Sequence, residues 1–228
     1  MDKEKIALIK ENIYRTCLAA NRDPKKIILL GASKSQTIED IEKAYENGIS
    51  HFGENYLQEA EFKIKQIHKS IIWHFIGSIQ TRKTKKIASL FDWVHTVDSL
   101  KIAERLNEAR PSSRGPLNIC LQVNIDKETT KSGILKEEID DFLINLTALK
   151  NIKTRGLMII PKPRDSAEEQ SKIFSDLRRK LDSLKSIFPE LDTLSMGMSS
   201  DYLIAIREGA TIVRIGTCLL YTSPSPRD

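Results

Sequence analysis

The chain has 228 residues, with 36 lysines and arginines against 31 aspartates and glutamates, which gives a formal net charge of +5. At roughly 150 residues per domain, this length allows one large domain or two small ones. Charged residues make up 29% of the chain, so the small positive surplus argues against the basic stripe of a nucleic-acid-binding protein. Hydrophobic residues make up 40%, which argues for a sizeable core and against global disorder.

Targeting and metal signals are weak along the whole sequence. The N-terminal residues carry charges of both signs without an apolar core, so we do not expect a secretory signal. The strongest apolar run, which begins at Ile27, is far too short to span a bilayer. The three cysteines lack a CxxC pair and the four histidines lack the spacing of zinc ligands. We therefore expect a cytoplasmic protein that contacts neither membrane nor nucleic acid.

The chain begins with a helix and then alternates short apolar runs with amphipathic segments. Apolar residues recur every three or four positions from Ile6 to Ala20, which predicts a helix with one buried face. The runs that follow have no polar alternation, as in strands buried on both faces of a parallel sheet. Eight strands are predicted, at Ile27–Ala32, Ile49–Gly53, Ile72–Gly77, Trp93–Val97, Asn118–Val123, Lys153–Ile159, Thr193–Met198 and Thr211–Gly216.

The segments between these strands have helix start and stop signals. Thr37 and Ser166 each precede an acidic residue by three positions, as in a capping box. An apolar stripe from Ile173 to Leu184 follows the second of them. Gly48 and Gly209 each lie just before a strand, where a glycine that ends a helix is expected.

Eight strand–helix units predict an α/β fold, a single (β/α)8 TIM-type barrel with an extra N-terminal helix. A doubly wound open sheet is the alternative. We favour the barrel because the strands number eight and no GxGxxG motif follows any of them. The barrel is expected to span residues 1–217, with insertions at Arg110–Pro116 and Pro161–Asp165, and residues 218–228 are expected to form an atypical tail.

Lys34 stands at the carboxyl end of the first predicted strand, where a barrel places its site. If its amine faces a partly desolvated pocket, the neutral form is favoured and can form a Schiff base with an aldehyde. The alternative is an ordinary solvated lysine at a strand end.

Small and hydroxyl residues end the seventh and eighth predicted strands. Ser199, Ser200 and Thr217 offer hydroxyl and backbone donors, and a helix follows Ser200, so a phosphate group fits there. The alternative is ordinary turn chemistry, in which Ser200 or Asp201 only caps the helix.

Other polar residues give weaker signals. Arg214 points into the barrel if the eighth strand is right, and a buried arginine needs an ion-pair partner or a ligand. His74, like His51 and His95, is more often a satisfied core histidine than a catalyst. The basic run Arg82–Lys86 is expected on a solvated helix face.

Taken together, the strand-end motifs resemble those of the pyridoxal phosphate homeostasis protein family, whose barrel is similar to the N-terminal domain of alanine racemase. The resemblance runs from the first helix to about Thr217. The matching motifs are SKS at 33–35, HFGEN at 51–55, WHFIG at 73–77, KSG at 131–133, RGLM at 155–158, SMGMS at 195–199 and VRIGT at 213–217.

The resemblance implies that pyridoxal 5′-phosphate (PLP) is the cofactor, held as a Schiff base on Lys34. It implies that Arg214 approaches the pyridine nitrogen, which makes the ring a poor electron sink and suits a carrier. It implies a phosphate site and a ring pocket, made respectively by Ser199, Ser200, Gly216 and Thr217 and by Asn55, His74 and Met158. After Thr217 the chain departs from the family, with a tail that contains two prolines.

The first hypothesis is a non-catalytic, monomeric PLP carrier that delivers PLP to apo-enzymes. A PLP-dependent racemase or decarboxylase is the second, although those enzymes have a further β-rich domain that we do not expect here. A Schiff-base aldolase that holds a sugar phosphate on Lys34 is the third. An RNA-binding module, suggested by the Arg82–Lys86 run, is the fourth.

Overall fold

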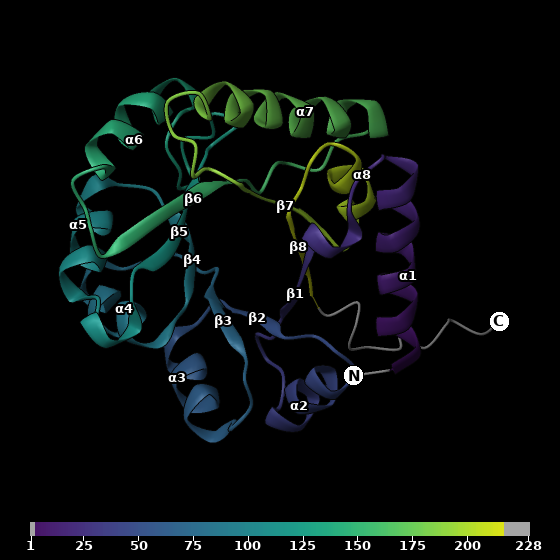
Figure 1. The fold of residues 1–228 in the computed structure, drawn as a ribbon, viewed down its shortest axis with the longest axis horizontal. Helices are drawn as coiled ribbons and strands as arrows, with labels where there is room; N and C mark the ends of the chain where they lie inside the picture. The colour runs from purple at the N-terminus through teal and green to yellow at the C-terminus, as the bar shows by residue number, and fades with distance from the viewer. Residues whose placement is uncertain (1–2, 217–228) are drawn as a thin grey trace.

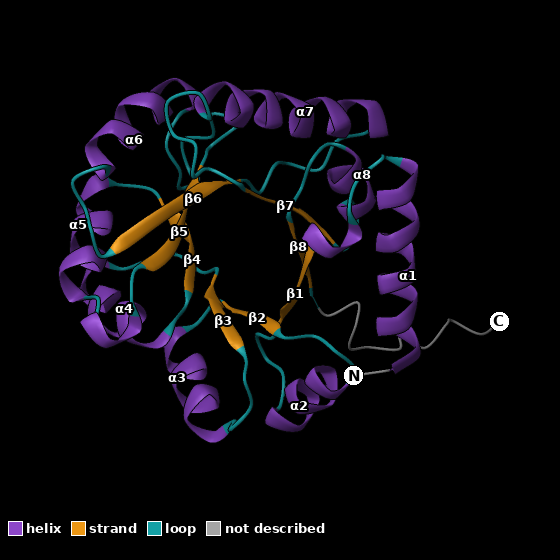
Figure 2. Cartoon of the chain, in the orientation of Figure 1, coloured by secondary structure: helices purple, strands orange, loops and turns teal. Residues whose placement is uncertain are grey.

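The computed structural model describes residues 3–216 (Figure 1). Eight parallel strands form a closed barrel in chain order, and β8 pairs back to β1 (Figure 2). This confirms the predicted barrel and excludes the open sheet. All eight predicted strands are present, with ends that differ by at most two residues. They are β1 Ile28–Ala32, β2 His51–Glu54, β3 Ile72–Phe75, β4 Trp93–Val97, β5 Leu117–Gln122, β6 Ile152–Met158, β7 Thr193–Met198 and β8 Ile212–Ile215.

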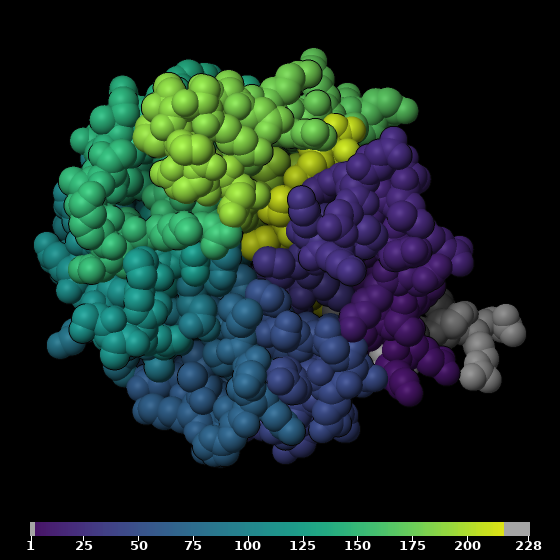
Figure 3. All heavy atoms as spheres, viewed as in Figure 1, coloured from purple at the N-terminus to yellow at the C-terminus, as the bar shows by residue number. Residues whose placement is uncertain are grey.

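Helices surround the barrel, and the predicted extra helix α1 completes their ring between α8 and α2 (Figure 1). In Figure 3 the N-terminal segments meet the yellow C-terminal segments at the surface. Within residues 3–216, no helix has the length and apolar character needed to cross a membrane. The helices are α1 Lys3–Ala19, α2 Ile38–Glu46, α3 Leu57–Gln66, α4 Thr84–Leu90, α5 Leu100–Ala109, α6 Ile139–Leu146, α7 Ala167–Leu184 and α8 Tyr202–Arg207.

The predicted helix signals are present in the structure. Thr37 Oγ1 accepts the Asp40 N–H at 3.1 Å at the start of α2, and Ser166 caps α7 in the same way. Gly48 and Gly209 have φ of +81° and +109°, the left-handed conformation that ends α2 and α8. Capping hydroxyls thus set where α2 and α7 begin, and glycines in a left-handed conformation set where α2 and α8 end.

The barrel encloses a small apolar cluster that includes Leu30, Trp93 and Met158, while a larger core lies between strands and helices. Barrel interiors are usually filled by branched apolar side chains. Here the remaining interior is polar: His74, His95, Ser195 and Arg214 are all buried. Residues 217–228, which hold Thr217 and the predicted tail, lie outside the described residues.

Candidate functional site

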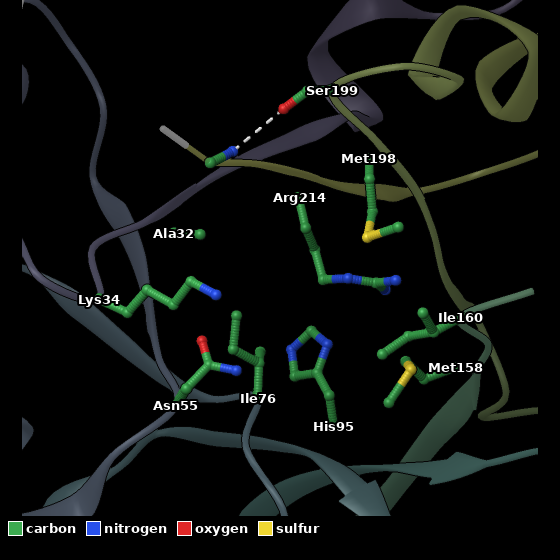
Figure 4. A pocket seen from close by; sticks show the side chains of 11 residues that line it. Ala32, Lys34, Asn55, Ile76, His95, Met158, Ile160, Met198, Ser199 and Arg214 are labelled. Carbon is green, nitrogen blue, oxygen red and sulfur yellow. Dashed lines mark hydrogen bonds between the residues drawn. The ribbon is translucent and has the colours of Figure 1, made fainter. Parts of the chain in front are cut away.

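A cavity of about 240 Å³ lies at the carboxyl ends of the strands (Figure 4). Six of the nine predicted site residues line it: Lys34, Asn55, Met158, Ser199, Arg214 and Gly216. Five further residues, which were not predicted from the sequence, also line it: Ala32, Ile76, His95, Ile160 and Met198. The barrel therefore brings together residues from both ends of the chain, as the strand-end pattern predicts.

The backbone on both sides of Lys34 is fixed by side chains from neighbouring elements. Ser35 adopts a left-handed φ of +61°, and its N–H donates to Glu59 Oε1 on α3 at 2.6 Å. On the other side, Lys63 Nζ donates to the Ser33 carbonyl oxygen at 2.6 Å. Lys34 is therefore presented from a turn that α3 holds in place.

A buried ion-pair cluster lies beneath this turn. Lys63, whose side chain is only 4% exposed, donates to Glu54 Oε1 at 2.8 Å and to Glu59 Oε1 at 2.6 Å. Ser33 Oγ donates to the same Glu54 oxygen at 2.7 Å. Burial raises the pKa of Glu54, while the hydrogen bonds from Lys63 and Ser33 act in the opposite direction. We call Ser33, Glu54, Glu59 and Lys63 the lysine clamp.

Lys34 itself extends into the cavity from this turn (Figure 4). Its side chain is exposed. The residue is exposed because it follows the strand end and stands in an open turn, and a partly desolvated amine stays a prediction. What distinguishes it is position: a primary amine aimed into a cavity with fixed backbone on either side.

The turn between β7 and α8 forms another wall of the cavity. Ser199 Oγ accepts the Gly216 N–H at 3.3 Å, which ties this turn to the end of β8 (Figure 4). Asp201 does not cap α8 with its side chain; it accepts the Met198 N–H at 2.6 Å instead. Within residues 3–216, the N–H groups of Ser199 and Ser200 donate to no other group. These two donors are available to an anion, although Ser200 is exposed and does not line the cavity.

Arg214 is a buried cation in the cavity wall, only 6% exposed. It donates to Ser195 Oγ at 2.7 Å and to the Ile159 carbonyl oxygen at 2.8 Å. Burial lowers the pKa of Arg214 to about 10, against the opposing charges of Asp201 and Cys120. A guanidinium has five N–H donors, and no carboxylate within residues 3–216 forms an ion pair with this one. The site therefore fits a ligand with an acceptor atom here.

The structure places His95, rather than His74, on the cavity wall. His74 is fully buried one layer below, where its ring stacks on Trp93 with centroids 5.5 Å apart. His74 Nδ1 is 2.8 Å from His95 Nε2. The sequence could have indicated His95, because residues two apart on a strand point to the same side. His95 therefore points inward like Trp93 on β4 and lies nearer the carboxyl end of the strand.

These groups suit a flat ligand with an electrophilic carbon near Lys34, an acceptor near Arg214 and an anionic group at the Ser199 turn. Apolar side chains, including Ile76, Met158 and Met198, supply walls for a ring. Residues 3–216 hold no cluster of His, Cys, Asp or Glu that would bind a metal ion. The donor set, an amine and a guanidinium beside free N–H groups, therefore fits an organic phosphate.

Comparisons with known proteins agree with this geometry. Residues 9–224 match the family model described as alanine racemase, N-terminal domain. The pyridoxal phosphate homeostasis protein of Pseudomonas aeruginosa is 46% identical over 217 residues, 95% of this chain and 93% of that protein. The one of Pasteurella multocida is 42% identical over 222 residues, 95% of each chain.

Among solved structures, that of PipY from Synechococcus elongatus with PLP bound has a TM-score of 0.80 and 34% sequence identity. The similarity covers 92% of this chain and all of that one. The sequence motifs, the closed barrel and these relatives lead to the same assignment. The chain belongs to the pyridoxal phosphate homeostasis protein family, whose barrel is that of the alanine racemase N-terminal domain.

Proposed function

We propose that this protein binds PLP in the cavity, holds it as a Schiff base on Lys34, and acts in PLP homeostasis as a carrier without catalysis of its own. The observation that carries the proposal is the amine of Lys34 aimed into a cavity that also holds a buried arginine, which forms no ion pair within residues 3–216 (Figure 4). The PLP-bound relative supports the same ligand.

Each wall of the cavity has a role in this proposal. PLP supplies an aldehyde that condenses with a primary amine: the Lys34 nitrogen bonds to the aldehyde carbon and one water leaves. Arg214 donates to the pyridine nitrogen. The ring lies among Asn55, His95 and Met158, with His74 behind. The proposed phosphate donors are Ser199, Ser200, Gly216 and Thr217, the last outside the described residues.

The chemistry of the walls supports a carrier rather than an enzyme. Arg214 keeps its positive charge at neutral pH, so the ring nitrogen beside it stays unprotonated and the ring is a poor electron sink. Burial lowers the pKa of His95 to about 3, helped by the charge of Arg214, so the ring is neutral at neutral pH and is not a general acid for bound PLP. In the described part of the chain, no carboxylate or phenol lines the cavity opposite Lys34 to move a proton.

The first test is the visible absorption spectrum of the purified protein with PLP, before and after borohydride. We expect a yellow band that borohydride shifts, and covalent modification of the peptide that contains Lys34. Lys34→Ala should lose both, while Lys85→Ala, an exposed lysine on α4, should keep them. A folded wild-type protein that stays colourless with excess PLP would overturn the proposal.

A second test separates the carrier from the alternatives. The PLP-loaded protein should restore activity to an apo PLP-dependent enzyme, and it should not racemise or decarboxylate amino acids above background. Turnover that disappears in Lys34→Ala would establish an enzyme instead. Borohydride trapping of a phosphorylated sugar on Lys34, with no PLP present, would favour a Schiff-base aldolase.

We expect the carrier to be a cytoplasmic monomer. Size-exclusion chromatography with light scattering measures the oligomeric state.

A further inference from the structure

Side chains from five strands form one continuous line of hydrogen bonds through the barrel interior. Arg214 on β8 donates to Ser195 Oγ on β7 at 2.7 Å. Ser195 Oγ is 2.8 Å from His95 Nδ1 on β4, and His95 Nε2 is 2.8 Å from His74 Nδ1 on β3. His74 Nε2 is 2.9 Å from His51 Nδ1 on β2. We call Ser195, His95, His74 and His51 the interior chain.

The hydroxyl of Ser195 fixes the direction of these bonds. Ser195 is fully buried, and within residues 3–216 its oxygen forms hydrogen bonds only with Arg214 and His95. Because Arg214 can only donate, the Ser195 proton has one acceptor available, His95 Nδ1. A buried hydroxyl proton without an acceptor is strongly disfavoured. His95 therefore carries its own proton on Nε2.

The tautomers of His74 and His51 follow from that of His95. The Nε2–H of His95 requires a free lone pair on His74 Nδ1, which puts the His74 proton on Nε2. His74 then donates to His51 Nδ1, so His51 is also the Nε2–H tautomer. Burial lowers the pKa of His74 well below its usual value and that of His95 to about 3. Both inner rings therefore stay neutral, and every bond points away from Arg214.

The far end of the chain opens at the other end of the barrel. His51 begins β2 and is half-buried, and it lines a second cavity of about 550 Å³ at the starts of β1 and β2. Lys10 on α1 lines the same cavity, as do Asp23 and Lys25, which precede β1. Burial lowers the pKa of His51, and the charge of Asp92, just before β4, acts in the opposite direction. Among the three histidines of the interior chain, His51 is the one that is not fully buried, so it is the member that solvent can reach.

A proton on His51 has a consequence for the whole chain. Protonated His51 donates from Nδ1, so His74 must accept at Nε2 and carry its proton on Nδ1, and His95 must do the same. Ser195 then accepts from both His95 and Arg214, and its own proton loses its acceptor. One solvent proton is taken up, and no other group gains or loses one overall. The Ser195 hydroxyl beside Arg214 thus changes its hydrogen bonding when His51, at the opposite end of the barrel, is protonated.

We propose that the interior chain couples protonation of His51 to the hydrogen bonding of Arg214, with Ser195, His95 and His74 as positioning residues for that guanidinium. The link to the cofactor rests on the proposed function, because it requires PLP beside Arg214. Coupling between two equilibria is reciprocal. If protonation of His51 weakens the hydrogen bond donated by Ser195 by some factor, loss of that bond raises the proton affinity of His51 by the same factor.

The first experiment uses histidine-selective ¹⁵N NMR on the protein without PLP. The protein has four histidines, and the exposed His68, which is not part of the interior chain, serves as an internal reference. We expect a single Nε2–H tautomer for His51, His74 and His95 above neutral pH, and a mixture for His68. An Nδ1–H tautomer at any of the three, which needs no variant to detect, would overturn the proposal.

Variants at Ser195 then test the coupling. Ser195→Ala removes the hydroxyl that sets the direction, so His51 should become a tautomer mixture and bind a proton about fivefold or more tightly, although Ser195 does not touch it. Ser195→Thr keeps the hydroxyl and should restore the wild-type tautomer. An unchanged His51 in Ser195→Ala, with near-UV circular dichroism showing a folded protein, would contradict the coupling.

The last experiment follows the visible band of bound PLP against pH. We expect an inflection that coincides with the His51 titration measured by NMR, disappears in His51→Gln and persists in His68→Gln. An unchanged profile in His51→Gln would overturn the link to the cofactor. If the protein fails to bind PLP at all, the proposed function fails, and the tautomers of the protein without PLP still decide whether the directed chain exists.

Discussion

The two sides of the cavity use their polar groups in opposite ways. On the Lys34 side, the lysine clamp joins Lys63 to two carboxylates and holds the backbone at Ser33 and Ser35. On the β7–β8 side, Arg214 keeps spare donors, and two N–H groups of the Ser199 turn donate to nothing within residues 3–216. The clamp residues pair with one another and build rigidity, although Glu54 Oε2 has no hydrogen-bond partner within residues 3–216, whereas the spare donors of the other side recognise a ligand. Substitutions on the first side should therefore change stability, and those on the second should change binding.

The largest expected effect is on the clamp. Lys63→Ala leaves Glu54 buried without its partner, which should lower the free energy of unfolding by about 3–5 kcal/mol. The matched control is Lys65→Ala on the same helix, which breaks an exposed pair with Glu61 and should lose less than about 1 kcal/mol. Urea denaturation measures both. Equal losses for the two variants would mean that the clamp does not differ from a surface pair.

Arg214→Gln tests the opposite side. We expect PLP binding to weaken about tenfold to a hundredfold, because a charged donor at the ring nitrogen is lost. The free energy of unfolding should change less than in Lys63→Ala, since a buried cation is removed along with its hydrogen bonds. Fluorescence titration with PLP and urea denaturation give the two values. The control is Arg207→Gln, at an exposed position on α8, which should change neither PLP binding nor the free energy of unfolding. A large stability loss with unchanged PLP binding in Arg214→Gln would reverse our assignment of the two sides.

The histidines below the cavity predict a pH dependence. His74 and His95 have lowered pKa values in the folded protein, whereas histidine in an unfolded chain titrates near 6.5. Below about pH 6.5 the unfolded state binds more protons, so stability falls as pH falls, by up to about 1.4 kcal/mol per pH unit for each histidine. Urea denaturation between pH 7 and 5 measures the slope. His95→Gln should make it shallower, and a slope that follows His68→Gln instead would contradict this source.

The smallest effect is expected at the Ser199 turn. Ser199→Ala removes one hydroxyl and leaves the backbone N–H groups, so PLP should bind about fivefold more weakly, as for one lost hydrogen bond. Pyridoxal without its phosphate should bind the variant and the wild type equally well. Equilibrium dialysis with both compounds checks this. A matching loss for pyridoxal would show that Ser199 acts on something other than the phosphate.

The fold and most of the cavity wall follow from the sequence because parallel strands buried on both faces leave uninterrupted apolar runs, and a barrel gathers their carboxyl ends. The position of a side chain along the barrel axis cannot be predicted from the sequence in the same way. His74 pairs in register with Trp93, which puts His95 one layer higher, and this stagger between β3 and β4 is a property of barrel closure. Lys63, likewise, reaches Glu54 only because α3 packs against the turn after β1.

The closure that makes the cavity also constrains how the protein is made. Ile28 at the start of β1 pairs with Ile212 on β8, and α1 packs against α8, so α1 and β1 find these partners only after α8 and β8 have been synthesised. Until β8 leaves the ribosome, β1 and β7 are open edges, and the apolar face of α1 has no covering helix. Folding dominated by such distant contacts is slow and exposes the nascent chain to aggregation. A chaperone that shields α1 during synthesis should therefore raise the yield of folded protein more than one that acts on the completed chain.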